Sequence, residues 1–241
     1  MAQKNNGKNY YGLFLNNFDS IIHAYLKEID DFLFVQIGAN DGIMADPINK
    51  FIKKNKKIKK GLLVEPQKKE FNRLKRNYKN KKGFIFENVA ISNKNEIRGL
   101  YKVKDEKICA DWQRGIATLI PNKGCVGKMK KKDLVIEKVK CITFDKLIKK
   151  HKIKKIDLLQ IDVEGYDYEI IKSINFSKIK PKMINYENDH LKDTEKESCI
   201  QLLQEKGYIV ITYGTDTIAL LNNLFKINSL IVESVNLKIK E

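Results

Sequence analysis

Short apolar runs alternate along this chain with segments of helical periodicity. The runs span 32–37, 61–65, 84–91, 156–162 and 183–187, and each is typical of a buried β-strand. Between two of them, Phe71, Leu74 and Tyr78 fall on one face of a predicted helix. Repeated strand–helix units predict a mainly parallel sheet with helices on both faces, and so an α/β fold.

The remaining apolar segments predict a different kind of pairing. Residues 208–213 and 217–222 are joined by a turn short enough for an antiparallel hairpin at the end of the sheet. Residues 96–103 and 135–142 are predicted extra or edge strands. Residues 104–130 lie between them, and their irregular, polar and glycine-containing sequence predicts a functional lid or binding loop.

Several helix boundaries have a local signal. Residues 45–54 are predicted to form a helix with Pro47 in its first turn. Thr143 is a predicted N-cap, and Thr194 with Glu197 has the spacing of a capping box. Gly207 suits the position after the end of that last helix.

The length of 241 residues and the 42% hydrophobic content suit one generous α/β domain. We predict a single domain over 1–241, with its core at about 30–222, the insertion at about 104–130 and a C-terminal extension at 223–241. No apolar run approaches the roughly 18 residues of a membrane helix. The first residues also lack a signal-peptide core. A cytoplasmic protein without membrane insertion is therefore expected.

The net charge of +17 suggests an anionic partner. However, only four of the 47 basic residues are arginine, and the lysines are spread through the chain. Because nucleic-acid readers favour the bidentate arginine fork, this pattern disfavours a nucleic-acid partner. A phosphorylated small substrate would benefit equally from the charge.

The four cysteines form no CxxC pair, which removes the signature of zinc ribbons and thioredoxin-like sites. They are Cys109, Cys125, Cys141 and Cys199. We predict that all four are reduced thiols.

In an open α/β sheet, ligands bind at the carboxyl ends of the strands. The first strand is followed by the turn Gly38-Ala39-Asn40-Asp41-Gly42, whose spacing differs from the G-x-G-x-x-G of dinucleotide sites. Its carboxylate suits a cationic amino-acid group better than a diphosphate. Glu65, before Pro66, stands where a carboxylate can accept both hydroxyls of a ribose. Asn88 ends the third strand, where the backbone and its side-chain amide could bind the edge of an adenine.

The fourth and fifth strands end in the densest polar groups of the chain. Asp162 and Glu164 follow the fourth strand, and Glu187, Asp189 and His190 follow the fifth. Carboxylates at a strand end are costly to bury unless they meet a ligand or a partner. This edge is therefore where we expect the chemistry.

At these positions the chain resembles the FkbM-type methyltransferases, class I enzymes that use S-adenosylmethionine. The resemblance rests on FVQIGANDG, LLVEPQ, NVAIS, LLQIDVEGYDYEII and DTIAL, and it covers about residues 30–222. It implies a Rossmann-like, seven-stranded, mainly parallel sheet of order 3-2-1-4-5-7-6. It also implies O-methylation, often of sugar hydroxyls in glycans or natural products.

Carried over residue by residue, the resemblance implies a cofactor site made of Gln36, Gly38, Ala39, Asn40, Asp41, Gly42, Glu65, Pro66, Asn88, Ala90 and Asp162. Asp162 and Glu164 would stand near the sulfonium and the acceptor pocket. Gln36 departs from the class, in which this position is commonly acidic. The attraction for the amino group of the cofactor is therefore expected to be weaker.

A hydroxyl acceptor needs a general base or a metal ion at neutral pH. The candidates for the catalytic base are His190, Asp162, Glu164, Glu187 and Asp189, and we favour His190 because imidazole titrates near neutrality. No metal is predicted as a resident group. An alternative leaves a magnesium ion open, with oxygen ligands from Asp162, Asn188 and Asp189.

The acceptor we predict is a sugar or nucleotide-linked sugar in surface polysaccharide synthesis. Asp111, Trp112 and Arg114, in the predicted lid, are the candidate substrate-binding residues. Residues 223–241 are a candidate contact in a homodimer. Two other functions stay open: a methyltransferase acting on RNA, favoured by the positive charge, and a non-catalytic cofactor-binding subunit, supported only by Gln36.

Overall fold

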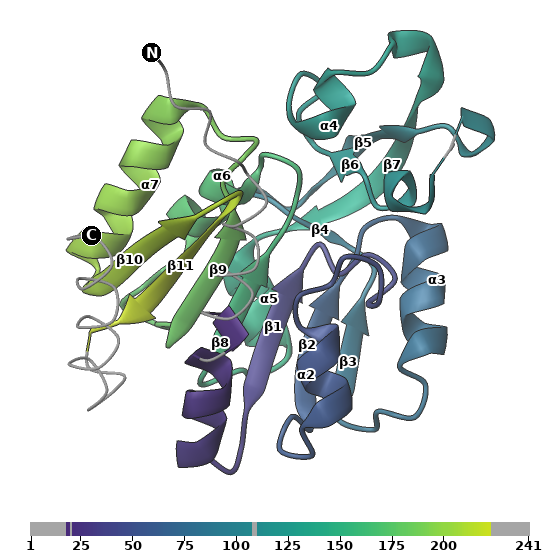
Figure 1. The fold of residues 1–241 in the computed structure, drawn as a ribbon. Helices are drawn as coiled ribbons and strands as arrows, with labels where there is room; N and C mark the ends of the chain where they lie inside the picture. Colours follow the sequence, from purple (N-terminus) through teal and green to yellow (C-terminus); the bar gives the residue numbers. More distant parts are fainter. Residues whose placement is uncertain (1–17, 20, 108–109, 223–241) are drawn as a thin grey trace, which may run out of the picture.

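The computed structural model describes residues 18–19, 21–107 and 110–222, and they form two sheets (Figure 1). The larger sheet has seven strands: β1 (Leu33–Ile37), β2 (Lys60–Val64), β3 (Phe84–Glu87), β8 (Leu158–Ile161), β9 (Met183–Glu187), β10 (Tyr208–Tyr213) and β11 (Asp216–Leu221). Their spatial order is β3-β2-β1-β8-β9-β11-β10. If these seven strands are renumbered 1 to 7 along the chain, their spatial order is 3-2-1-4-5-7-6, as the resemblance implied.

The direction of the strands also follows the prediction. Strands β1, β2, β3, β8 and β9 run parallel, whereas β11 is antiparallel to both β9 and β10. The central strands are buried on both faces, which explains why their sequences are continuous apolar runs and do not alternate. All parallel strands therefore end at one edge of the sheet.

Helices cover both faces of this sheet, and each face has its own core. One core joins the sheet to a helix at residues 21–28 and to α2 (Asn49–Lys54) and α3 (Lys68–Asn77). The other joins it to α5 (Phe144–Lys150), α6 (Asp167–Ser173) and α7 (Asp193–Glu205). This three-layer arrangement is the α/β class that the sequence predicted.

The second sheet has four strands and lies beyond one end of the first (Figure 1). Its strands are β4 (Ala90–Ile91), β5 (Glu96–Val103), β6 (Ala117–Thr118) and β7 (Leu134–Ile142), in the order β4-β7-β5-β6. The apolar run 84–91, predicted as one strand, is divided between β3 and β4. The predicted extra strands 96–103 and 135–142 pair with each other as β5 and β7.

Four local signals can be compared with the observed helix ends. The Thr143 hydroxyl accepts a hydrogen bond from the Lys146 amide, and Gly207 follows α7 with φ +85°, so both signals are confirmed. The capping box was placed wrongly, because Glu195 accepts a bond from the Lys192 amide, two residues earlier than the predicted pair Thr194 and Glu197. Helix α2 begins at Asn49, after Pro47.

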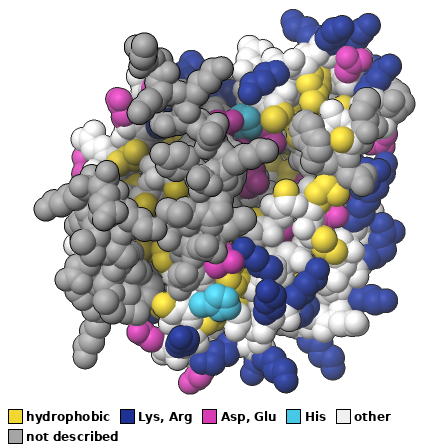
Figure 2. All heavy atoms as spheres, in the orientation of Figure 1, with side chains coloured by type: hydrophobic (Ala, Val, Ile, Leu, Met, Phe, Trp, Pro, Cys, Tyr) yellow, Lys and Arg dark blue, Asp and Glu magenta, His cyan; other side chains and the backbone are white. Residues whose placement is uncertain are grey.

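The described residues of the predicted insertion, and those just after it, contain only short helical segments besides β6. These are η1 (Asp105–Lys107), η2 (Asp111–Arg114), α4 (Gly124–Gly127) and η3 (Lys131–Asp133). No helix in the described part of the chain is long and apolar enough to cross a membrane. Lysine and arginine side chains gather along the upper, right and lower edges of the face in Figure 2. Residues 223–241 and Cys109 lie outside the described residues.

Candidate functional site

A pocket opens where β1, β2, β8 and β9 end, below the second sheet. The sequence-predicted residues that line it are Gln36, Gly38, Ala39, Asn40, Glu65, Pro66, Ala90, Asp162, Glu164, Glu187 and His190. Strands far apart in sequence thus bring most of the candidates together. The parallel arrangement explains this, since it places all of these strand ends at one edge.

The turn after β1 forms one wall of the pocket. Gly38 has φ +83°, and a Cβ at this position would lie 1.8 Å from the carbonyl oxygen of Asp162. The amides of Gly38 and Ala39 both donate to the Val64 carbonyl, which ties the turn to β2. Only glycine fits this close approach of two strand ends.

Glu65 is the buried carboxylate at the end of β2, with 3% of its surface exposed. Its two oxygens accept hydrogen bonds from the amides of Asn40 (2.9 Å) and Gln67 (2.7 Å). Burial raises the pKa of Glu65 to about 8 despite these bonds. Each oxygen keeps a further lone pair, so the carboxylate can accept two more donors from a ligand.

Asp46 is a pocket residue that the sequence analysis missed. It accepts hydrogen bonds from the Gln36 side chain (3.2 Å) and from the amides of Ile48 and Asn49. Burial raises its pKa to about 6. The Oε1 atom of Gln36 is buried without a hydrogen-bond partner. A carboxylate thus lies beside Gln36, although position 36 itself is not acidic.

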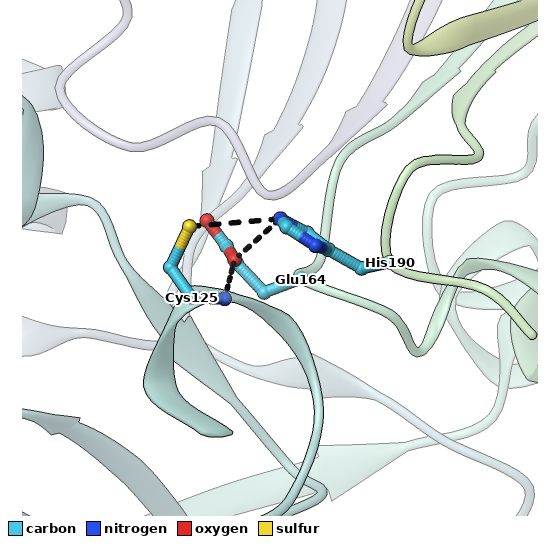
Figure 3. Close-up of side chains that lie close together, drawn as sticks. All are labelled: Cys125, Glu164 and His190. Atoms are coloured by element: carbon cyan, nitrogen blue, oxygen red, sulfur yellow. Dashed lines mark hydrogen bonds and ion pairs between the residues drawn. The ribbon is translucent and has the colours of Figure 1, made fainter. Parts of the chain in front are cut away.

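In another part of the pocket, His190 lies beside Glu164 and Cys125 (Figure 3). Its Nε2 atom is 3.2 Å from Glu164 Oε2 and 3.6 Å from Glu187 Oε1. The amide of Cys125 donates to Glu164 Oε2 at 3.0 Å. The Sγ atom of Cys125 is 3.7 Å from His190 Nε2.

The ionisable side chains in this part of the pocket shift one another's pKa values. Burial and neighbouring carboxylates raise the pKa values of Asp162 and Glu187. Burial also acts on Glu164, but the hydrogen bonds from His190 and the Cys125 amide outweigh it and lower its pKa. The bond to Glu164 raises the pKa of His190, and burial raises that of the Cys125 thiol to about 11. The pKa shifts of Glu164 and His190 both favour the ionised forms, so the contact between these two side chains is strongest when the imidazole is protonated.

The predicted lid does contribute to the pocket. Gly115, Ile116, Ala117, Leu119 and Cys125 line it. The Gln67 side chain donates to the Gly115 carbonyl, and Lys123 pairs with Glu195 of α7. The side chains of Asp111 and Trp112 lie outside the described part of the structure, and Arg114 is not among the lining residues.

Besides Arg114, four predicted residues with described side chains do not line the pocket. The Asp41 carboxylate accepts bonds from the amides of Ile43 and Met44 in its own turn. Gly42 packs below Tyr78, and the amide of Asn88 donates to the carbonyls of Glu65 and Pro66. The Asp189 side chain is 52% exposed and lies 3.8 Å from His190 Nδ1.

The alternative magnesium set includes Asn188. Its amide nitrogen donates to the carbonyl of Asp216 and to the hydroxyl of Thr217. Among the described residues, the group of three or more acidic, cysteine or histidine side chains close enough to share an ion is a different one: Cys125, Glu164 and His190.

The model of the FkbM methyltransferase domain matches residues 36–210, which is most of the chain and includes the carboxyl ends of all four pocket strands. The chain belongs to the FkbM methyltransferase family. It is therefore a methyltransferase, and its cofactor is S-adenosylmethionine. No curated protein matches the sequence.

Solved structures of low similarity include other methyltransferases. A Methanococcus jannaschii fibrillarin pre-rRNA processing protein is 12% identical, with a TM-score of 0.41 over 80% of this chain and 67% of that one. Precorrin-6y C5,15-methyltransferase from Geobacter metallireducens is 10% identical, with a TM-score of 0.40 over 83% and 87%. Ribosomal protein L11 methylase from Lactobacillus delbrueckii is 10% identical, with a TM-score of 0.39 over 82% and 73%. Similarities at this level say nothing about the acceptor of the FkbM protein.

The pocket of this FkbM methyltransferase fits its cofactor at two places. Glu65 offers two lone pairs to a ribose diol, and the buried Gln36 Oε1 atom lacks a donor that an ammonium group would provide. Glu164, whose pKa is lowered, offers negative charge to a sulfonium, whereas the raised pKa values of Asp162 and Glu187 favour their protonated forms until a cation lies nearby. Sequence reasoning missed Asp46 and Cys125. An acidic residue three positions before the first residue of a helix is an N-terminal signal that could have found Asp46, whereas no motif surrounds Cys125.

Proposed function

We propose that this enzyme methylates a hydroxyl of a sugar or nucleotide-linked sugar, in the synthesis of a surface polysaccharide. The observation that carries this proposal is the pairing of His190 Nε2 with Glu164 Oε2, 3.2 Å apart, in the wall of the pocket. A hydroxyl is a poor nucleophile at neutral pH and gains most from such a base. Thiol and amine acceptors depend less on one.

Another part of the pocket holds the cofactor in this proposal. Glu65 accepts the two ribose hydroxyls, while Asp46 and Gln36 face the amino-acid part. Gly38, Ala39 and Asn40 form the wall beside them, with Pro66 and Ala90 toward the adenine. When bound, S-adenosylmethionine supplies the methyl group as an electrophile on a sulfonium.

The protein then has to align the acceptor and remove its proton. Glu164 holds the imidazole by its Nε2 atom and so fixes the ring beside the pocket. In the neutral imidazole Nε2–H donates to Glu164 and Nδ1 holds the lone pair, so the acceptor hydroxyl would pass its proton to Nδ1 while its oxygen gains the methyl group and the sulfonium loses it. Glu164, 3.2 Å from Nε2, stabilises the imidazolium that results, and Glu187 lies 3.6 Å from the same atom. Asp162 adds negative charge on the side of the sulfonium once this cation is bound.

Acceptor recognition is assigned to the insertion at about 104–130. We propose that Asp111, Trp112 and Arg114 bind the sugar or its phosphate groups. The single domain over 1–241 and a homodimer remain part of this proposal. The carboxylates around His190 support a neutral sugar as the group next to the base, since they oppose a polyanion there.

The base assignment is tested by His190→Ala. We expect turnover to fall by about 10²–10⁴-fold, the usual contribution of a general base, while the affinity for S-adenosylmethionine stays within about twofold. Turnover is measured by transfer of a labelled methyl group to a panel of sugars and nucleotide sugars. His23→Ala is the matched control, since this exposed histidine packs on Phe51, away from the pocket. Near-normal turnover of His190→Ala would remove the base role.

RNA is the competing acceptor, favoured by the net charge of +17. A strongly salt-dependent shift of RNA, together with methyl transfer to it, would replace the sugar proposal. Failure of all acceptors with intact cofactor binding would leave the cofactor assignment standing and the acceptor class open. Loss of activity on exhaustive chelation would favour the magnesium alternative.

A further inference from the structure

Cys125, Glu164 and His190 come from three separate elements and meet at one point of the pocket wall (Figure 3). Cys125 lies in α4 of the insertion, Glu164 follows β8, and His190 follows β9. One ligand atom from each lies within 4.8 Å of the other two. We call these three side chains the Cys125–Glu164–His190 cluster.

The spacing of the cluster matches a tetrahedral metal site. A zinc ion with bonds of about 2.0 Å to nitrogen or oxygen and about 2.3 Å to sulfur sets its ligands roughly 3.3 Å (N–O) and 3.5 Å (N–S) apart. The observed separations are 3.2 Å between Nε2 and the Glu164 oxygen and 3.7 Å between Nε2 and Sγ. Two of the three separations therefore already match the edge lengths that such an ion requires, and the third, between Sγ and a Glu164 oxygen, is within 4.8 Å.

The surroundings favour a cation and leave it one open position. Glu187 Oε1 is 3.6 Å from Nε2, and the Oε2 atom of the same residue is buried without a hydrogen-bond partner. All four side chains line the pocket, so a fourth ligand can come from Glu187, water or an acceptor. Thiolate, imidazole and carboxylate together are a ligand set for zinc and its first-row neighbours, not for magnesium.

We propose that the Cys125–Glu164–His190 cluster binds a zinc-class divalent ion at the acceptor end of the pocket, and that the bound ion blocks methyl transfer. Binding replaces the S–H bond of Cys125 by an S–metal bond, and the proton passes to solvent. An imidazole bound to the ion through Nε2 carries its own proton on Nδ1, so no lone pair of the ring is left for the proton of an acceptor. The blocking rests on the proposed role of His190 as the base, whereas the metal site rests on the geometry alone.

Cobalt(II) is the probe for the metal site, because a thiolate ligand gives it an intense charge-transfer band in the near ultraviolet. We expect the full chain to bind one cobalt ion with this band and with the visible bands of tetrahedral cobalt. Zinc should displace the cobalt and abolish both. A protein that binds no stoichiometric cobalt, or binds it without the thiolate band, would overturn the proposal.

Substitution of Cys125 tests whether its thiolate is a ligand of the bound ion. Cys125→Ala should lose the charge-transfer band and weaken zinc affinity about a hundredfold or more, since even residues that only support a metal ligand cost 10–100-fold. Cys141→Ala is the matched control, because this buried thiol of β7 is not in the cluster and should leave band and affinity unchanged. If Cys125→Ala does not fold, protection of Cys125 from alkylation by zinc in the wild-type chain decides the question.

A methyl-transfer assay with added zinc separates the two halves of the inference. We expect inhibition that follows the occupancy measured with cobalt displacement and that a chelator reverses. Cobalt and zinc binding without inhibition would keep the metal site but overturn both the blocking and the base role of His190. Absence of binding with normal methyl transfer would leave the proposed function intact and remove the metal site.

Discussion

Glu65 links cofactor binding to pH, because burial raises its pKa to about 8 in the free protein. Hydroxyl donors from a ribose favour the ionised carboxylate and so lower this pKa in the complex. Below pH 8 a proton must therefore leave before the cofactor binds. The affinity for S-adenosylmethionine should fall as the pH falls from about 8, by at most about tenfold per pH unit.

Calorimetry between about pH 6 and 9 measures this dependence. Glu65→Gln should bind more weakly at pH 9 and lose the part of the pH dependence that Glu65 contributes. Glu169→Gln is a suitable control, because this residue pairs with Lys172 on the outside of α6. The same pH profile in wild type and Glu65→Gln would contradict the role of Glu65.

Asp46 supplies the negative charge that position 36 lacks. Asp46→Asn keeps a side-chain oxygen for the amides of Ile48 and Asn49 but removes the charge. We expect the affinity for S-adenosylmethionine to fall by about tenfold or more, the usual value of a charge-assisted hydrogen bond. The melting temperature should change little. Asp145→Asn, which alters an exposed pair with Lys178, should leave affinity unchanged; equal affinities in all three proteins would refute the assignment.

At the scale of elements, the turn between β1 and its following segment is the most constrained connection. Gly38→Ala would place a Cβ 1.8 Å from a backbone oxygen at φ +83°. We expect a loss of about 2–4 kcal/mol of unfolding free energy, measured by urea denaturation. Gly214→Ala is the control, since φ is +53° but nothing lies within 4 Å, and it should cost about 1–2 kcal/mol. Equal losses would show that the close approach is not limiting.

The elements themselves were largely predictable. Continuous apolar runs marked the buried strands, and their polar ends located Glu65, Glu164 and His190 at one edge of the sheet. The second sheet was not predictable as a separate sheet, because the polar pair Glu87-Asn88 marks the end of a strand but not the sheet that the next apolar residues join. The chain leaves the large sheet after β3 near Asn88, whose amide bonds to the carbonyls of Glu65 and Pro66. Such a bond between distant segments leaves no periodic signal.

For the whole molecule, the buried carboxylates predict how stability changes with pH. The folded-state pKa values of Glu65 (about 8), Asp46 (about 6) and Asp216 (about 6) all lie above their ordinary values, mainly because of burial. The folded protein therefore binds more protons than the unfolded chain between about pH 4 and 8. Unfolding free energy should fall as the pH rises through this window.

Thermal melting of the cofactor-free protein measures this trend. We expect the melting temperature to be higher near pH 5 than near pH 8, and the decrease to be smaller in Glu65→Gln. The carboxylates whose pKa is lowered, such as Glu164 and Glu195, lose their contribution only below this window. A melting temperature that rises from pH 5 to pH 8 would contradict the effect of these buried groups.

The insertion that covers the pocket joins two properties that could otherwise vary separately. Its Gly115 carbonyl is held by Gln67, next to Glu65, while its Cys125 amide is held by Glu164, next to His190. Replacement of this one segment would thus alter both the choice of acceptor and the rate at which spent cofactor leaves. Related enzymes can therefore diverge by changes in this insertion, while the part of the pocket that the strand ends form stays the same.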